Sequence, residues 1–340
     1  MTDPIFRFLC ALQGLETGFP RTRRVSLALW LTIALTYPVS TIVYFRNMTA
    51  DESVHVGLSE LTNAIGILAY IASTYFSLYV FVTKHDCIER LLRINPSPPA
   101  SMLFCLVSGV PSLCLILRFM IEMSRADAIV AHVNFLFSIF SEVMLPMIYL
   151  SVVEGLLVQL GRVQLRISDG RLSFRDVVSE KWKLRGAILT VNSFFRIPLA
   201  LQHAQIFVTV ITFSATWVGI NRTDYGMVIA FFIPIARLAV VCREARRASE
   251  LISRWMDIEI SLRKPPYAVV FTPTEHAELI RVCRLREEWD ALQVACYTLR
   301  MKNSVKFLST VFTWVSVVSQ FDYKIMRALT RMSDANSTQS

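Results

Sequence analysis

The sequence predicts an all-α membrane protein with seven transmembrane helices, and three observations lead to that prediction. The 340 residues are 54% hydrophobic, with a mean hydropathy of +0.48. Several apolar runs reach about 20 residues, enough for a helix rising about 1.5 Å per residue to cross a hydrocarbon core about 30 Å thick. Charged residues make up only 18% of the chain and gather between those runs. The chain therefore carries more apolar length than a soluble two-domain protein of this size needs.

Seven apolar runs are the predicted spans. They cover residues 25–44, 57–83, 102–121, 128–159, 190–219, 225–242 and 306–325. The fourth run is longer than a membrane requires, so we expect it to continue as a helix into water or to tilt. Prolines fall inside the spans at Pro38, Pro111, Pro146, Pro198 and Pro234. Kinks are tolerated there because neighbouring helices can satisfy the carbonyls that each proline leaves without an amide partner.

Positive charge sets the predicted orientation, because cytoplasmic segments of membrane proteins are enriched in Lys and Arg. The alternate segments 1–24, 84–101, 160–189 and 243–306 hold 26 of the 35 Lys and Arg residues. The N-terminus is therefore predicted to be cytoplasmic and the C-terminus extracellular. Three N-x-[ST] glycosylation sequons agree with this orientation because all lie on the outer side, at Asn47, Asn221 and Asn336. The seven cysteines fall in cytoplasmic or intramembrane positions, so no disulfide is expected.

The sequence disfavours several other classes of protein. It contains no G-x-x-x-x-G-K-[ST], G-x-G-x-x-G, H-E-x-x-H or paired C-x-x-C motif, and no cofactor or metal site is expected. No nucleophile and base converge, which argues against an enzyme. Membrane orientation accounts for the net charge of +9, so no nucleic-acid partner is expected. A secondary transporter would favour internal repeats, and a seven-helix metabotropic receptor would have the opposite polarity; both remain alternatives.

The last span closes in TWVSVVSQF, residues 313–321, where polar residues recur with helical spacing. Thr313, Ser316, Val317 and Gln320 share one helix face, and Phe321 lies beside Gln320. Such a stripe suits a water-filled pore, which Val317 and Phe321 can close by dewetting. The alternative is a polar seam that forms hydrogen bonds with neighbouring helices.

The inverted topology, the large basic loop before the last span and the TWVSVVSQF segment together resemble the arthropod gustatory receptor family, which comprises insect-type seven-transmembrane chemoreceptor channels. Members of that family end in Thr-Tyr, five hydrophobic residues and Gln-Phe. Thr313, Gln320 and Phe321 match this motif at the family's spacing, and Trp314 replaces the tyrosine. Two of the five intervening residues are serines, which departs from the family pattern. A second similarity is Asn192-Ser193-Phe194-Phe195, where the family often has an Asn followed shortly by Phe.

The resemblance implies a ligand-gated, non-selective cation channel in the plasma membrane, activated by a small-molecule tastant. It implies a tetramer of identical or related subunits around a pore built from the last helix. The implied domains are a cytoplasmic N-terminus (1–24), a ligand-binding bundle of six helices (25–242), a cytoplasmic helical anchor (243–305), the pore helix (306–325) and an extracellular tail (326–340).

Polar residues inside spans are costly and often functional, so they are the candidates for the ligand pocket. They are Asn63, Arg118, His132, Asn134, Glu142, Gln202 and His203. Arg118 can instead extend its charge to the outer surface, and Glu142 can pair with a cation or remain protonated. Hydrogen bonding between helices is the alternative role for the whole set.

The inner segment before the last span is predicted to be helical. Thr272-Pro273-Thr274-Glu275 is a helix start, with Thr272 as the cap and Glu275 reaching back. Apolar residues then follow at heptad-like spacing, at Val282, Leu285, Trp289, Leu292, Cys296 and Leu299. The family resemblance implies that this seam holds the tetramer together, and burial within the same subunit is the alternative. A second, basic inner helix is predicted over residues 160–185, either solvated or bound to anionic lipid.

Overall fold

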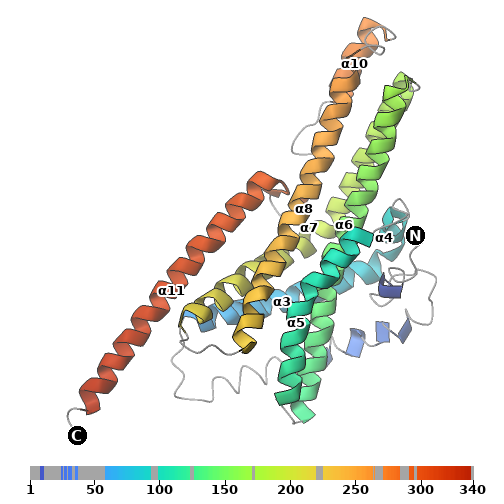
Figure 1. Cartoon of the computed structure of the whole chain (residues 1–340). Coiled ribbons are helices and arrows are strands. Elements are labelled where there is room, and N and C mark those ends of the chain that lie inside the picture. Colours follow the sequence, from blue (N-terminus) through green and yellow to red (C-terminus); the bar gives the residue numbers. More distant parts are fainter. Residues whose placement is uncertain are drawn as a thin grey trace.

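The computed structural model describes residues 8–10, 24–25, 27–28, 30–32, 35–36, 58–92, 99–122, 126–170, 173–219, 225–262, 264, 271–283, 291–294 and 297–337. The helices are α3 (Leu58–Thr83), α4 (His85–Leu92), α5 (Pro99–Glu122), α6 (Ala126–Ser168), α7 (Phe174–Gly219), α8 (Tyr225–Leu262), α10 (Pro273–Cys283) and α11 (Met301–Ser337) (Figure 1). One antiparallel pair of strands, β1 (Gln293–Val294) and β2 (Tyr297–Thr298), precedes α11. The prediction of an all-α chain is thus confirmed apart from this hairpin.

The long helices extend the predicted spans mainly toward one end of the molecule. α6, α7 and α8 contain the predicted spans 128–159, 190–219 and 225–242, and each continues well past the inner boundary. Figure 1 shows these continuations running side by side beyond α4 and the start of α5. The expected continuation of the fourth span as a helix is therefore confirmed. We refer to these continuations, with α10 and the β1–β2 hairpin, as the inner bundle.

Other predicted segments differ from the structure or lie outside the part that it describes. The first span, 25–44, lies largely outside the described residues, as do the sequons at Asn47 and Asn221. α11 extends past both ends of the predicted span 306–325, so most of the predicted tail, with Asn336, is helical.

Two stretches of the described helices, Glu142–Ser168 and Phe174–Ile211, are long and apolar enough to cross a membrane. α5 has an exposed apolar face. Its large exposed apolar side chains recur at spacings of three or four residues, at Leu103, Val107, Val110, Leu113 and Leu117. An exposed apolar stripe of this kind indicates a surface that meets lipid or another protein.

α7 is the central helix, in contact with α3, α6, α8, α10, α11 and β1. The main core lies where α6, α7 and α8 meet, and includes an edge-to-face contact between Tyr149 and Phe195 with ring centroids 5.7 Å apart. α5 approaches α6 closely at Gly109, where an added Cβ would lie 2.7 Å from Val143 Cγ2. A larger residue at this position would force the Val143 side chain to shift, because an added Cβ would overlap its methyl group.

The prediction of one helix over residues 160–185 is wrong. α6 ends at Ser168, and Gly170 adopts a left-handed φ of 69°, which glycine accommodates without steric cost. Ser173 then caps α7. Its hydroxyl donates to the Asp176 carboxylate at 2.8 Å, and each of these two side chains also accepts the backbone N–H of the other residue. The chain therefore folds back as a helical hairpin, and its basic residues belong to two antiparallel helices.

The predicted start of α10 is confirmed. Thr272 Oγ1 accepts the Glu275 backbone N–H at 3.3 Å, and the Glu275 carboxylate accepts the Thr272 backbone N–H at 3.0 Å. These are the reciprocal bonds of a capping box. The hydrogen bonds from the Thr272 backbone and hydroxyl hold the pKa of Glu275 below its usual range.

This cap makes the stability of α10 depend on pH. Because the pKa of Glu275 is lower in the folded chain, the cap contributes fully above the ordinary glutamate pKa and is lost as the pH falls through the lowered value. We expect hydrogen exchange of the peptide covering 272–283 to accelerate over that acidic range, beyond the intrinsic pH effect. The Glu275→Gln variant should lack the additional acceleration, and equal pH profiles for the two proteins would contradict the assignment.

The predicted helical seam running from Val282 to Leu299 is wrong, because α10 ends at Cys283 and β1 and β2 follow. Leu292 and Leu299 lie opposite each other across the hairpin, with the Leu299 N–H bonded to the Leu292 carbonyl at 2.8 Å. Both side chains are buried within the main core of the same chain. The alternative left open by the sequence, burial within one subunit, therefore holds for these two residues. Leu285, Trp289 and Cys296 lie outside the described residues.

Candidate functional site

α11 has one buried face and one exposed face. The buried side chains Ser304, Val311 and Val318 recur at helical spacing and turn toward the bundle. The predicted pore residues Thr313, Ser316 and Gln320 are exposed, as is Phe321, while Val317 is half-buried at the edge. The predicted common face is therefore present, and no other described helix of the chain covers it.

The hydroxyl groups on this face are bonded within α11 itself. Thr313 Oγ1 donates to the Ser309 carbonyl at 2.9 Å, and Ser316 Oγ donates to the Phe312 carbonyl at 3.0 Å. Neither hydroxyl donates to a neighbouring helix of the same chain. For Thr313 and Ser316, the structure therefore does not show the alternative role, which was hydrogen bonding to a neighbouring helix of the same subunit.

The inner half of α11 packs on α7 and α8. Val311 lies in a small core with Ile206, Val210 and Val241, and Val318 packs farther along with Ile211. Near its start, Phe307 contacts the rings of Phe207 and His203, each with centroids 6.1 Å apart. Any movement of α7 at this level therefore acts on the buried face of α11.

A buried cluster of polar side chains joins α5, α6, α7 and α8 at mid-depth. Glu142 of α6 forms an ion pair with Arg237 of α8, with Oε2 and Nη2 2.5 Å apart and both side chains at least nine-tenths buried. Arg237 also donates to the Ser112 hydroxyl of α5 at 3.3 Å, and Gln205 of α7 donates to the other Glu142 carboxylate oxygen. Four helices are thus connected through one pair of opposite charges.

Gln202 completes this cluster by satisfying a backbone carbonyl that a proline leaves free. Pro146 has no N–H to donate to the Glu142 carbonyl four residues earlier. Gln202 Nε2 donates to that carbonyl instead, at 2.8 Å. The expectation that a neighbouring helix would satisfy such a carbonyl is confirmed at this proline.

A second buried pair lies closer to the inner bundle. His203 Nε2 and Glu244 Oε2 are 2.8 Å apart, and both side chains are almost fully buried. His203 also contacts Phe307 of α11. This pair therefore connects α7, α8 and the start of α11.

The three predicted pocket residues whose side chains the structure describes fall into two groups. Glu142 and Gln202 meet in the mid-depth cluster, whereas His203 belongs to the separate pair with Glu244. The other four lie in α3, α5 and α6 at positions whose side chains are outside the described part of the structure, and they are Asn63, Arg118, His132 and Asn134.

Sequence reasoning missed Arg237, Gln205 and Glu244. Two signals were present, because Arg237 and Glu142 are charges of opposite sign within the predicted spans, and Gln205 lies one turn after Gln202 on the same face. The sequence predicted that Glu142 would pair with a cation or remain protonated, and Arg237 is the cation.

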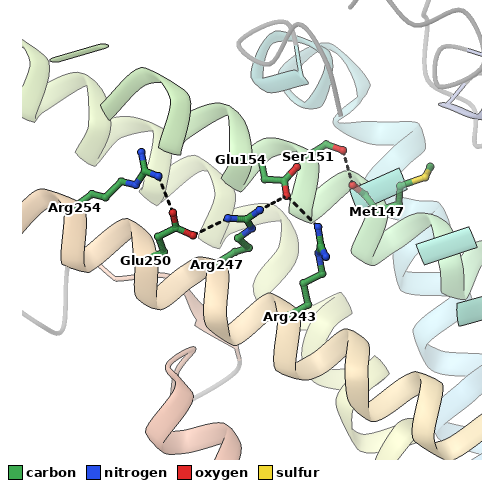
Figure 2. A network of polar contacts seen from close by, with 7 residues as sticks. All are labelled: Met147, Ser151, Glu154, Arg243, Arg247, Glu250 and Arg254. Carbon is green, nitrogen blue, oxygen red and sulfur yellow. Dashed lines mark hydrogen bonds and ion pairs between the residues drawn. The ribbon is translucent and has the colours of Figure 1, made fainter. Parts of the chain in front are cut away.

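A chain of ion pairs holds α8 against α6 in the inner bundle (Figure 2). Arg254, Glu250 and Arg247 alternate along one face of α8, and Arg247 and Arg243 both reach the Glu154 carboxylate of α6 at 3.3 and 3.6 Å. Partial burial alone would raise the pKa of Glu250, but hydrogen bonds from Arg247 and Arg254 outweigh it and lower the pKa. These half-exposed pairs orient the inner ends of the two helices.

Long helices in this structure join a buried charge cluster to the inner bundle, and the last helix packs on the central one. The insect olfactory receptor OR5 from Machilis hrabei, in complex with eugenol, superposes with a TM-score of 0.68 at 12% identity, over 93% of this chain and 97% of the receptor. A second structure of that receptor gives a TM-score of 0.66 at 13% identity with the same coverage. The chain therefore has the fold of an insect olfactory receptor, which confirms the sequence resemblance to insect-type chemoreceptors at the level of the fold.

Comparison by sequence gives no further relative, since no family model matches the chain and no curated protein matches it.

Proposed function

We propose that this chain is a subunit of a gustatory-type chemoreceptor, a tetrameric ligand-gated channel that passes cations without strong selectivity. The observation that carries the proposal is the olfactory receptor fold over nearly the whole chain. The TWVSVVSQF segment at the end of the chain supports the gustatory type, because it follows the motif of that family at three of its four named positions.

In this proposal the exposed face of α11 lines a pore on the axis of the tetramer. Thr313 and Ser316 satisfy their own donors within the helix, which leaves their oxygen atoms able to meet water or ions. The Gln320 amide offers further dipoles at the outer end, and Val317 with Phe321 provides an apolar constriction.

The proposed ligand is a small organic molecule bound among α3 to α8. The complex of the olfactory receptor with eugenol supports this class of ligand. Within the predicted pocket set, Glu142 and His203 are already engaged by buried ionic partners. Gln202 and Gln205, one turn apart on α7, each have a buried side-chain carbonyl oxygen that accepts no hydrogen bond from the described residues. Both oxygens can therefore accept a hydrogen bond from a ligand hydroxyl.

The proposed location is the plasma membrane, with the N-terminus inside and the C-terminus outside. The distribution of Lys and Arg supports this orientation. An epitope placed after Ser340 should be stained on intact cells, and staining only after permeabilisation would overturn the orientation.

Voltage clamp of cells expressing the chain tests the proposed function. A panel of sugars, bitter compounds, carbon dioxide and eugenol should evoke a cation current that persists when G-protein signalling is blocked. A response that disappears with the block would favour the metabotropic receptor. Substrate-coupled flux without channel openings would favour the transporter.

The tetramer is proposed to assemble through one surface of the inner bundle, the exposed face of α8 that carries Met256 and Ile260 one turn apart. We expect Ile260→Glu to shift the purified protein from tetramer to smaller species on native gels, because it would bury a charge in an apolar interface. Leu165→Glu is the matched control, since Leu165 is exposed on the α6–α7 hairpin. Equal oligomer distributions for both variants would contradict this interface.

A further inference from the structure

The Asn192 side chain of the central helix α7 forms hydrogen bonds with the segment between α10 and α11. The Asn192 amide Nδ2 donates to the Ala291 carbonyl at 2.9 Å, and its Oδ1 accepts the Gln293 backbone N–H at 2.9 Å. Both groups lie on the same edge of the β1 strand, because a carbonyl and the N–H two residues later point to one side of an extended chain. The Asn192 side chain therefore pairs with that edge as a neighbouring strand would.

The opposite edge of β1 continues the connection to α11. The Leu292 carbonyl accepts the Leu299 N–H at 2.8 Å, and β1 pairs with β2. The carbonyl of Thr298 in β2 then accepts the Asn303 side-chain amide in the first turn of α11, at 2.6 Å. A continuous run of hydrogen bonds thus joins the middle of α7 to the first turn of α11.

The hairpin has little freedom to absorb a movement of α7. Leu292, Val294 and Leu299 are fully buried in the main core. The backbone N–H of Met301 is also bonded to the Ser249 hydroxyl of α8 at 3.0 Å. The hairpin is therefore a buried connector bonded to α7 through Asn192, and the start of α11 that follows it is bonded to α8 through Ser249.

We infer that Asn192 is a positioning residue that transmits movement of α7 to α11 and holds the inner end of α11 in place. This inference rests on the proposed function, since it assigns to α11 the role of the pore helix. Its chemical basis is that a primary amide is both a donor and an acceptor, and the two backbone groups at the strand edge require one of each.

The first test is the unliganded open probability of purified channels in planar bilayers with symmetric KCl and no added compound. Asn192→Ala removes both hydrogen bonds, so the inner end of α11 is released and openings become about tenfold more frequent, the factor expected for the loss of two such bonds. Ser193→Ala is the matched control, because Ser193 is exposed and bonds only to the Thr190 carbonyl of its own helix. An open probability of Asn192→Ala equal to or below that of the wild type would overturn the inference.

The second test separates positioning from a general loss of structure. In Asn192→Asp the carboxylate accepts from Gln293 but repels the Ala291 carbonyl, so openings should be frequent near neutral pH. A protonated carboxyl has the donor and acceptor pattern of the amide, so acidifying the cytoplasmic solution to about pH 4, near the carboxyl pKa, should restore the hydrogen bonds and reduce openings toward the wild-type level at that pH. No difference in pH response between this variant and the wild type would overturn the inference, even if Asn192→Ala fails to fold.

Failure of the inference is distinguishable from failure of the proposed function. If the wild type never conducts cations, either alone or with the ligand panel, the channel function itself is wrong. If the wild type conducts and the Asn192 variants behave like it, only the positioning role is wrong.

Discussion

Arg237→Gln is expected to destabilise the folded protein by about 3–5 kcal/mol, because it leaves the Glu142 carboxylate buried without its cation. The two side chains form the ion pair that connects α6 with α8, and Gln205 and Ser112 bond to its members from α7 and α5. Thermal unfolding of the detergent-purified protein, followed by size-exclusion chromatography, should show a large fall in the midpoint, together with low surface expression.

Two controls show whether loss of pairing is the cause. The Glu142→Gln and Arg237→Gln double variant should recover much of the lost stability, because no unpaired charge then remains. Arg247→Gln makes the same substitution in the half-exposed network of the inner bundle and should cost less than about 1 kcal/mol. Equal destabilisation by the single and double variants would show that the charge pair is not what holds the four helices together.

Gln320→Ala and Phe321→Ala are expected to change the current itself rather than the amount of folded protein. Both side chains are exposed on α11, so their truncation leaves no cavity within the subunit. If they line the pore, loss of the Gln320 amide should change single-channel conductance by roughly twofold or more, and loss of the Phe321 ring should raise leak current by removing an apolar constriction.

Phe232→Ala provides the matched control for these variants. Phe232 is also an exposed phenylalanine, but it lies on α8 and not on the pore helix proposed here. We expect it to retain wild-type conductance and leak in single-channel recordings at equal surface expression. Ordinary currents from both Gln320→Ala and Phe321→Ala would rule out this face as the pore lining.

Much of the fold follows from features local in the sequence. The apolar runs predicted α3, α5, α6, α7, α8 and α11, and the Thr272–Glu275 box predicted the start of α10. The break between α6 and α7 also had a local signal, in Gly170 and the Ser173–Asp176 cap, although the basic periodicity was interpreted as one helix. The shared face of Thr313, Ser316 and Gln320 likewise follows from helical spacing alone.

The sequence by itself determined most of the helices and the polar face of α11, because hydrophobic run length, helix caps and periodicity depend on neighbours in the chain. Tertiary structure alone decided that residues 293–294 and 297–298 pair as strands, despite the helix-like spacing of the apolar residues around them. The backbone there forms hydrogen bonds with Asn192, about a hundred residues earlier, and the side chains of Leu292 and Leu299 are buried in the core. It also decided which charges of the predicted spans meet, since Glu142 and Arg237 lie 95 residues apart and pair only when α6 and α8 pack. Both outcomes depend on long-range hydrogen bonding and desolvation, which no local pattern encodes.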